Sequence, residues 1–389
     1  MLFSTRPKED RRDLYDRERE IDMIKESIER REWVSVIGPK RVGKTSLVNV
    51  AVKETNNAVI QVNLMRLYDP RKKQYPKEDF IRLFLESVNT SIRNYTALGK
   101  AIRIVSNILG VEGQGELDLN SLKLKARLKR LRGQDISYLL SEMNSLARDN
   151  GKKLVVVLDE SQELSKVMGV NFSSIFHHVY DNCENTVIVF TGSQSRLVER
   201  VLRNMEYSEP FFGRYIRTVP LGRFTRDQSV DFLERGFREE GVKVERDVIE
   251  GVVDLLDGIP GWLTLFGSEY SFGVKHGLKP NLEKIVDRAT EEVKSEVLNF
   301  LEASQSPFRY SAIILALDRV RSATLNEIVK VASSILGEEI PEPRVYEMLK
   351  RLVDLEFVMK DGDRYKLQPD EPGMRGTVMA AKEILQGRE

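Results

Sequence analysis

Two glycines, a lysine and a threonine form one short stretch that can bind phosphate. Gly38 is followed by four residues and then by Gly43, Lys44 and Thr45, so the stretch fits the pattern G-x-x-x-x-G-K-[ST] without a mismatch. In this pattern backbone N–H groups close around phosphate oxygens, the lysine reaches the β- and γ-phosphates, and the hydroxyl binds Mg²⁺. We therefore expect a nucleotide site, with Lys44 as a catalytic cation and Thr45 as a metal ligand.

The variable residues of this stretch contribute mainly through their backbone. Their N–H groups belong to the phosphate cradle, whereas the side chains of Lys40 and Arg41 are expected to face solvent. The expected nucleotide contacts here are Gly38, Pro39, Arg41, Val42, Gly43, Lys44, Thr45 and Ser46.

A second set of chemical groups follows a run of apolar β-formers, as in a Walker B motif. The run at 154–158 is continued by Asp159 and Glu160. A carboxylate at the end of a sheet strand can hold Mg²⁺ through water, and a second carboxylate can orient and polarise the attacking water. We assign Asp159 to the metal and Glu160 to catalysis.

A glutamate directly after the metal-binding aspartate indicates the additional-strand, catalytic-glutamate subclass of P-loop proteins. In this subclass an extra strand lies between the strands of the two motifs, and residues 186–191 are the candidate. A hydroxyl at its end could contact the γ-phosphate or the attacking water. Thr191 and Ser193 both fit this role, and we place Ser193 in the catalytic set.

These groups need a scaffold that brings the ends of several strands together. Continuous runs of Val, Ile and Leu favour strands buried on both faces, as in a parallel sheet covered by helices. Such runs lie at 33–37, 58–64, 154–158, 186–191 and 215–219. Helical patterns such as 78–93 and 136–149 supply the covering layers. The prediction is an α/β fold with a parallel sheet.

The remaining chain of this 389-residue protein is long enough for further domains. Helical patterns from about 225 to 300 predict a lid, and the order helix, helix, helix, hairpin at about 303–370 is typical of a winged helix. The predicted domains are a nucleotide-binding core at 1–222, a helical lid at 223–300, a winged helix at 301–372 and a tail at 373–389.

One segment of the core alternates apolar and polar residues with a period of two. We expect residues 115–131 to form a β-hairpin inserted at the edge of the sheet. Its polar side carries Lys123, Lys125, Arg127 and Lys129. Two interpretations stay open, namely a solvated face that protects an exposed edge and a docking strip for an acidic partner.

Composition argues against several classes of protein. Cys183 is the single cysteine, so a disulfide framework is excluded. His177 and His178 are adjacent, which puts them on different helix faces, and His276 is remote, so the three histidines do not favour a zinc site. The formal net charge of +1 gives no overall basic field for nucleic acid. No apolar run is long enough for a membrane span, so we expect a soluble, cytoplasmic protein.

Several motifs together resemble one family. They are "YDREREI", "GPKRVGKTS", "VVVLDESQEL", "FTGSQ", "FFGRYIRTVPLGRFT" and "GIPGWLTLFG", and the resemblance that they carry covers nearly the whole chain. In combination they resemble the archaeal ATPase family, a branch of the STAND NTPases related to AAA-type ATPases. The resemblance implies binding of ATP or ADP with Mg²⁺, hydrolysis of ATP, a helical lid and a C-terminal winged helix.

The resemblance also implies contacts with the nucleoside. Tyr15 and Arg17 in "YDRERE" match an element that lies near the adenine, although a charged helix start has the same appearance. Pro260 in "GIPG" matches the G-x-P element at the start of a lid helix, which packs near the adenine.

Arg214 in "FFGR" matches the family's Gly-Arg arginine. A guanidinium there can neutralise charge on the transferred phosphoryl group, in cis or from a neighbouring subunit, and a structural role is the alternative. The lid departs from many AAA-type relatives, because residues 261–263 are Gly-Trp-Leu where those relatives carry a sensor arginine. This departure favours slow turnover.

The expected recognition segment of the winged helix, residues 341–360, has four basic and four acidic residues. The segment therefore lacks the excess of positive charge that binding to a phosphate backbone needs. A protein partner or an intramolecular clasp is at least as well supported as DNA. We expect an ATP-driven switch. The alternative is a DNA-binding ATPase resembling origin-loading proteins, whereas Glu160 argues against a non-hydrolysing adaptor.

Overall fold

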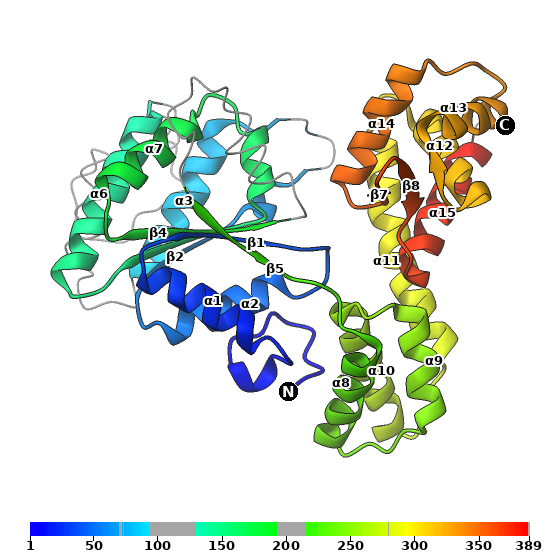
Figure 1. Ribbon diagram of the computed structural model, residues 1–389, viewed down its shortest axis with the longest axis horizontal. Helices are drawn as coiled ribbons and strands as arrows, with labels where there is room; N and C mark the ends of the chain where they lie inside the picture. Colours follow the sequence, from blue (N-terminus) through cyan, green and yellow to red (C-terminus); the bar gives the residue numbers. More distant parts are fainter. Residues whose placement is uncertain (70–71, 73, 93–129, 193–214, 279, 388–389) are drawn as a thin grey trace. The chain divides into compact units, whose positions relative to one another are not determined.

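Figure 1 shows the computed structural model, which describes residues 1–69, 72, 74–92, 130–192, 215–278 and 280–387. The chain divides into two compact units. The sheet unit comprises Pro7–Gly38 and Lys44–Leu221. The helical unit comprises Met1–Arg6, Pro39–Gly43 and Gly222–Glu389. The expected hairpin at 115–131 lies almost entirely outside the described residues.

The sheet unit is built on five parallel strands in the order β2-β3-β4-β1-β5. Each strand lies within one residue of its predicted bounds: β1 (Trp33–Ile37), β2 (Ala58–Asn63), β3 (Leu154–Asp159), β4 (Thr186–Gly192) and β5 (Ile216–Pro220). β4 lies between β1 and β3, which confirms the additional-strand arrangement. β3 and β4 are buried along their whole length, because helices cover both faces of the sheet.

Helices form a layer on each side of this sheet (Figure 1). One layer contains α1 (Glu18–Glu29) and α2 (Lys44–Glu54), and the other contains α3 (Lys77–Ile92), α6 (Gly133–Asp149) and α7 (Phe172–Asn182). Short 3-10 turns are η1 (Arg11–Asp13), η2 (Leu64–Leu67) and η3 (Ser161–Lys166). α2 begins at Lys44 and η3 directly follows Glu160, so local structure changes at both predicted motifs.

Four helices of the helical unit lie in the range that the sequence predicted for the lid. They are α8 (Arg226–Glu240), α9 (Arg246–Leu256), α10 (Pro260–Lys275) and α11 (Leu282–Ala303), the last of which extends three residues beyond it. Phe3 packs edge-on against Phe232 and Phe237 of α8. A Cβ atom at Gly236 would lie 2.2 Å from the Phe3 ring, so glycine is needed for this close approach. The first residues of the chain are thereby packed into the helical unit. No periodic pattern in the sequence predicted this packing.

The C-terminal elements follow the order expected for a winged helix. They are α12 (Pro307–Val320), β6 (Ala323–Thr324), α13 (Leu325–Leu336), α14 (Glu342–Asp354), β7 (Val358–Asp361) and β8 (Arg364–Leu367). The three strands form an antiparallel sheet in the order β6-β8-β7. The assignment as a winged helix stays a prediction.

The last helix, α15 (Glu371–Gln386), packs along α11 and α12. A Cβ atom at Gly376 would lie 2.6 Å from the carbonyl oxygen of Thr290 on α11, so the two helices approach closely there. None of the described helices is both long and apolar enough to cross a membrane.

Candidate active site

Polar side chains of three elements meet at the carboxyl edge of the parallel sheet. Asp159 ends β3, Thr191 lies near the end of β4, and Thr45 lies in the first turn of α2. The Thr45 hydroxyl donates to the two carboxylate oxygens of Asp159 at 3.2 and 3.1 Å. The Thr191 hydroxyl donates to Asp159 Oδ1. The sequence motifs are therefore joined in space as their chemistry requires.

Lys44 is buried at the N-terminal end of α2, with 6% of its surface exposed. Its Nζ donates to the carbonyl oxygen of Gly38 at 2.8 Å, so the two ends of the phosphate loop are linked. Gly43 has φ = 96°, a backbone conformation that glycine adopts at no steric cost. The helix N-terminus adds partial positive charge, which favours an anion beside Lys44.

Asp159 and Thr45 have the oxygen donors that Mg²⁺ prefers. Burial raises the pKa of Asp159, and the charge of Glu160 adds to the rise, whereas hydrogen bonds from Thr191 and Thr45 oppose it. A buried carboxylate of this kind is stabilised by a nearby cation. These two residues thus fit Mg²⁺, for which phosphate and water would supply the remaining ligands.

Glu160 has an unusual backbone conformation for a non-glycine residue, with φ = 55° and ψ = 49°. Such left-handed residues cost about 1–3 kcal/mol and cluster at functional sites. The Glu160 N–H donates to Thr191 Oγ1 at 3.0 Å, and Gln162 Nε2 donates to the Glu160 carboxylate at 2.5 Å. Ser161 Oγ lies 3.0 Å from the carbonyl oxygen of Thr191, which further fixes the turn.

Thr191 therefore links the two acidic residues, since its hydroxyl donates to Asp159 and accepts from the backbone of Glu160. The sequence had indicated Thr191 and Ser193 as candidates for the hydroxyl near the γ-phosphate, because both lie at the end of the predicted strand. The other candidate, Ser193, lies outside the described residues, as does Arg214, and the roles of both stay predictions.

We expect Thr191→Val to lower turnover about tenfold or more while leaving the Kd for ADP within threefold. Valine keeps the shape but removes a hydrogen bond to a charged group, which is worth about 1.5–3 kcal/mol. Steady-state hydrolysis and calorimetry measure the two quantities. Thr186→Val is the matched control, because Thr186 is also buried on β4 but donates to Asn144. Unchanged turnover in Thr191→Val would contradict the assignment.

The residues expected near the nucleoside lie at the starts of two helices. Arg17 is the residue directly before α1 and has 7% of its surface exposed, and its guanidinium lies 3.6 Å from the Glu20 carboxylate. Burial lowers the pKa of Arg17, and the charges of Glu20 and Asp16 oppose this shift. Tyr15 is half-buried just before this helix, and Pro260 is the first residue of α10. Their contacts with the base stay predictions.

The side chains of Lys40 and Arg41 differ from the expectation that they face solvent. Both lie in the helical unit, where Lys40 Nζ binds Glu296 and the Arg41 guanidinium lies 4.3 Å from the centre of the Trp262 ring. These partners could not be predicted from the sequence, because they are more than 200 positions away along the chain.

Comparisons with known proteins place the chain among ATPases. A family model described as an ATPase domain predominantly from Archaea matches residues 14–266. A Walker-type ATPase of Pyrococcus abyssi is 29% identical, with a TM-score of 0.75, and the alignment covers 97% of this chain and 100% of that one. No curated protein matches the chain.

A more distant solved structure shares the fold. The ORC2 protein of Aeropyrum pernix, solved as ADPNP and ADP complexes, is 13% identical with a TM-score of 0.58, and 96% of this chain and 95% of that chain are covered. The phosphate loop, the paired acidic residues and the additional strand are together typical of the additional-strand, catalytic-glutamate subclass of P-loop proteins. Since the family model also spans more than half of the sequence, the chain belongs to the family of ATPases found predominantly in Archaea.

Proposed function

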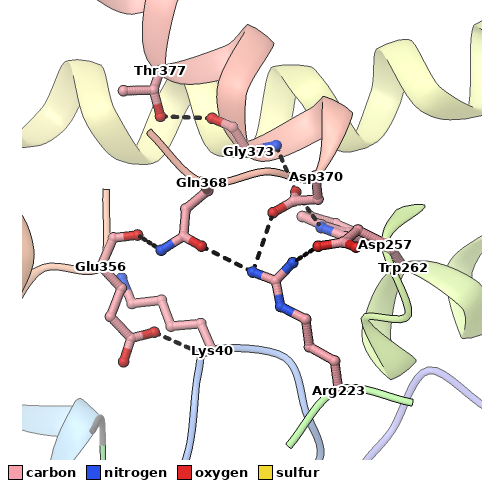
Figure 2. A network of polar contacts seen from close by, with 9 residues as sticks. All are labelled: Lys40, Arg223, Asp257, Trp262, Glu356, Gln368, Asp370, Gly373 and Thr377. Atoms are coloured by element: carbon pink, nitrogen blue, oxygen red, sulfur yellow. Dashed lines mark hydrogen bonds and ion pairs between the residues drawn. The ribbon is translucent and has the colours of Figure 1, made fainter. Parts of the chain in front are cut away.

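We propose that this ATPase turns over slowly and acts as a nucleotide-dependent switch. In this proposal the C-terminal winged helix binds a protein partner or inhibits the protein by an intramolecular contact. The observation that carries it is a network of polar contacts in the helical unit, which joins a phosphate-loop residue to both ends of the C-terminal hairpin (Figure 2).

The first half of the network connects Lys40 to this hairpin. The backbone N–H of Lys40 donates to the carboxylate of Glu356, two residues before β7, at 2.6 Å. Gln368, directly after β8, donates to the carbonyl oxygen of Glu356 at 2.7 Å. Arg223 in turn donates to Gln368 Oε1 at 2.9 Å. A shift of the phosphate loop would therefore disturb bonds at both ends of the hairpin.

The second half connects the lid helices to α15 (Figure 2). Arg223 pairs with Asp257, and the buried Asp370 accepts from Trp262 Nε1 at 3.2 Å and from the Gly373 N–H at 2.7 Å. Burial raises the pKa of Asp370 against these bonds. Partly satisfied buried networks are costly, so disturbing one contact favours rearrangement of the others. This property suits a switch.

In the proposed reaction each residue of the sheet unit has a separate task. Lys44 and the loop N–H groups bind the phosphates, and Thr45 and Asp159 hold Mg²⁺. When bound, Mg²⁺ neutralises charge on the β- and γ-phosphate oxygens. Glu160 orients the attacking water and accepts its proton, and Thr191 fixes the distance between the two acidic residues. Arg214 is proposed to stabilise the transferred phosphoryl group.

The alternative is a DNA-binding ATPase, and the charges of the hairpin weigh against it. Arg364 donates to the carbonyl oxygen of Ser322 at 2.6 Å and pairs with Glu327 at 3.4 Å. Lys366 pairs with Asp361 at 3.5 Å. These cations already have acidic neighbours, which reduces their attraction for a phosphate backbone.

One pair of measurements tests the proposal. We expect a kcat far below the enzyme median of about 10 s⁻¹, and duplex DNA binding that is weak and changes little with salt. A kcat near that median would contradict the switch. The alternative would be favoured by tight binding to duplex DNA if the logarithm of the binding constant fell by several units for each tenfold increase in salt concentration.

A further inference from the structure

We propose that Gly261, Trp262 and Glu296 are positioning residues for the phosphate loop, because they hold Arg41 in the strained backbone conformation that the phosphate cradle needs. The inference rests on the proposed nucleotide site at residues 38–45 and adds a determinant of its affinity. None of the three residues belongs to a phosphate-binding or Walker motif.

The strain is located at Arg41. Its φ is 64°, in the left-handed region that side chains other than glycine rarely adopt. Two residues later Gly43 also has a positive φ of 96°, whereas Val42 between them does not. Alternation of this kind turns successive backbone N–H groups toward one side, where they form an anion-binding nest. Relaxation of Arg41 to a negative φ would turn these groups apart.

The backbone of Arg41 is held by the start of α10. The N–H of Gly261 donates to the Arg41 carbonyl oxygen at 2.9 Å. This N–H lies in the first turn of the helix, where backbone donors have no partner within the helix. A Cβ atom at Gly261 would lie 2.8 Å from the Arg41 Cβ and 3.1 Å from its carbonyl oxygen. Glycine at 261 is thus required by the close approach of the two segments.

The side chain of Arg41 is held on two further sides. Its guanidinium lies 4.3 Å from the centre of the Trp262 ring, a cation–π distance. Its Nη2 lies 3.5 Å from Glu296 Oε2, and Lys40 Nζ binds the other oxygen of the same carboxylate. The Trp262 ring is itself fixed, because it is 4% exposed and its Nε1 donates to Asp370.

The charges agree with a stable arrangement around Glu296. Burial by itself raises the pKa of Glu296, but the charges of Lys40 and Arg41 and their hydrogen bonds outweigh it, so the net pKa lies below its ordinary value. The carboxylate is therefore ionised at neutral pH and pairs with both loop cations. Since phosphate is expected to bind through backbone N–H groups and Lys44, these pairs support the cradle without occupying it.

The first test is Glu296→Gln, which keeps the shape and removes the charge. We expect the Kd for ADP with Mg²⁺, measured by calorimetry, to rise about tenfold, the scale of a lost hydrogen bond to a charged group. Glu292→Gln is the control, because it makes the same change one turn earlier on α11 at an exposed position; its Kd should match wild type. Circular dichroism melting without nucleotide checks that both variants fold.

The second test separates positioning from direct electrostatics. Arg41→Gly places glycine where a positive φ costs nothing, so Glu296→Gln in that background should change the Kd less than threefold. A double-mutant cycle measures this coupling. Tighter ADP binding by Glu296→Gln would show that the carboxylate competes with phosphate, and an equal tenfold loss in both backgrounds would show that Arg41 is not its target. Either result overturns the inference.

The two proposals fail in different ways. If Lys44→Ala binds ADP like wild type, the nucleotide site itself is misplaced. If Lys44→Ala loses binding but Glu296→Gln keeps wild-type affinity, only the positioning role is wrong.

Discussion

Lys44→Ala is expected to abolish binding of both ATP and ADP. The ammonium group is buried at the N-terminus of α2 and bonds to Gly38 across the phosphate loop. Alanine removes a cation placed for the β- and γ-phosphates and also opens this link. Backbone N–H groups alone cannot offset the charge of a di- or triphosphate, so no other part of the loop replaces the lysine.

Calorimetry with ATP and ADP measures the effect directly. Lys53→Ala is the matched control on the same helix, because Lys53 is exposed and pairs only at the surface with Asp10, 3.2 Å away, and Glu9, 3.9 Å away. Surface pairs contribute little, so this variant should bind like wild type. An affinity of Lys44→Ala within threefold of wild type would disprove the phosphate-loop assignment.

Glu160→Gln is expected to bind ATP normally but to hydrolyse it at least about 10²-fold more slowly, the usual scale for loss of a positioned base. Glutamine keeps the size of the side chain, and Gln162 can still donate to its amide oxygen. The backbone bond from residue 160 to Thr191 is also retained. The strained turn should therefore persist while the basic oxygen is lost.

Single-turnover hydrolysis isolates the chemical step from product release. Glu184→Gln serves as the control, since it removes an exposed carboxylate from the turn before β4 and should leave the rate unchanged. If Glu160→Gln hydrolyses ATP at the wild-type rate, Glu160 is not the base. Thr191 and Ser193 would then be the next residues to replace.

The sequence alone predicted the parts of the fold that depend on neighbouring residues. Runs of Val, Ile and Leu predicted five strands buried on both faces, because side chains on both faces of a covered sheet must be apolar. All five strands form, and β1, β3 and β4 are buried. The edge strands β2 and β5 differ from the prediction, because each has exposed residues. Glu160 after Asp159 indicated the additional strand, which the strand order confirms. The phosphate loop was equally visible, because its donors follow one another in a single stretch.

Only the tertiary structure decided which distant groups meet. Arg41 lies on Trp262 and near Glu296, Lys40 bonds to Glu356, and Phe3 packs against α8. No periodicity marks these partners, since hundreds of residues separate most of them and each contact depends on how complete elements pack. Thr191 is an intermediate case, because the end of β4 was predictable. Its hydrogen bonds to Asp159 and Glu160 could not be predicted, because they depend on the parallel register that brings the ends of β3 and β4 together.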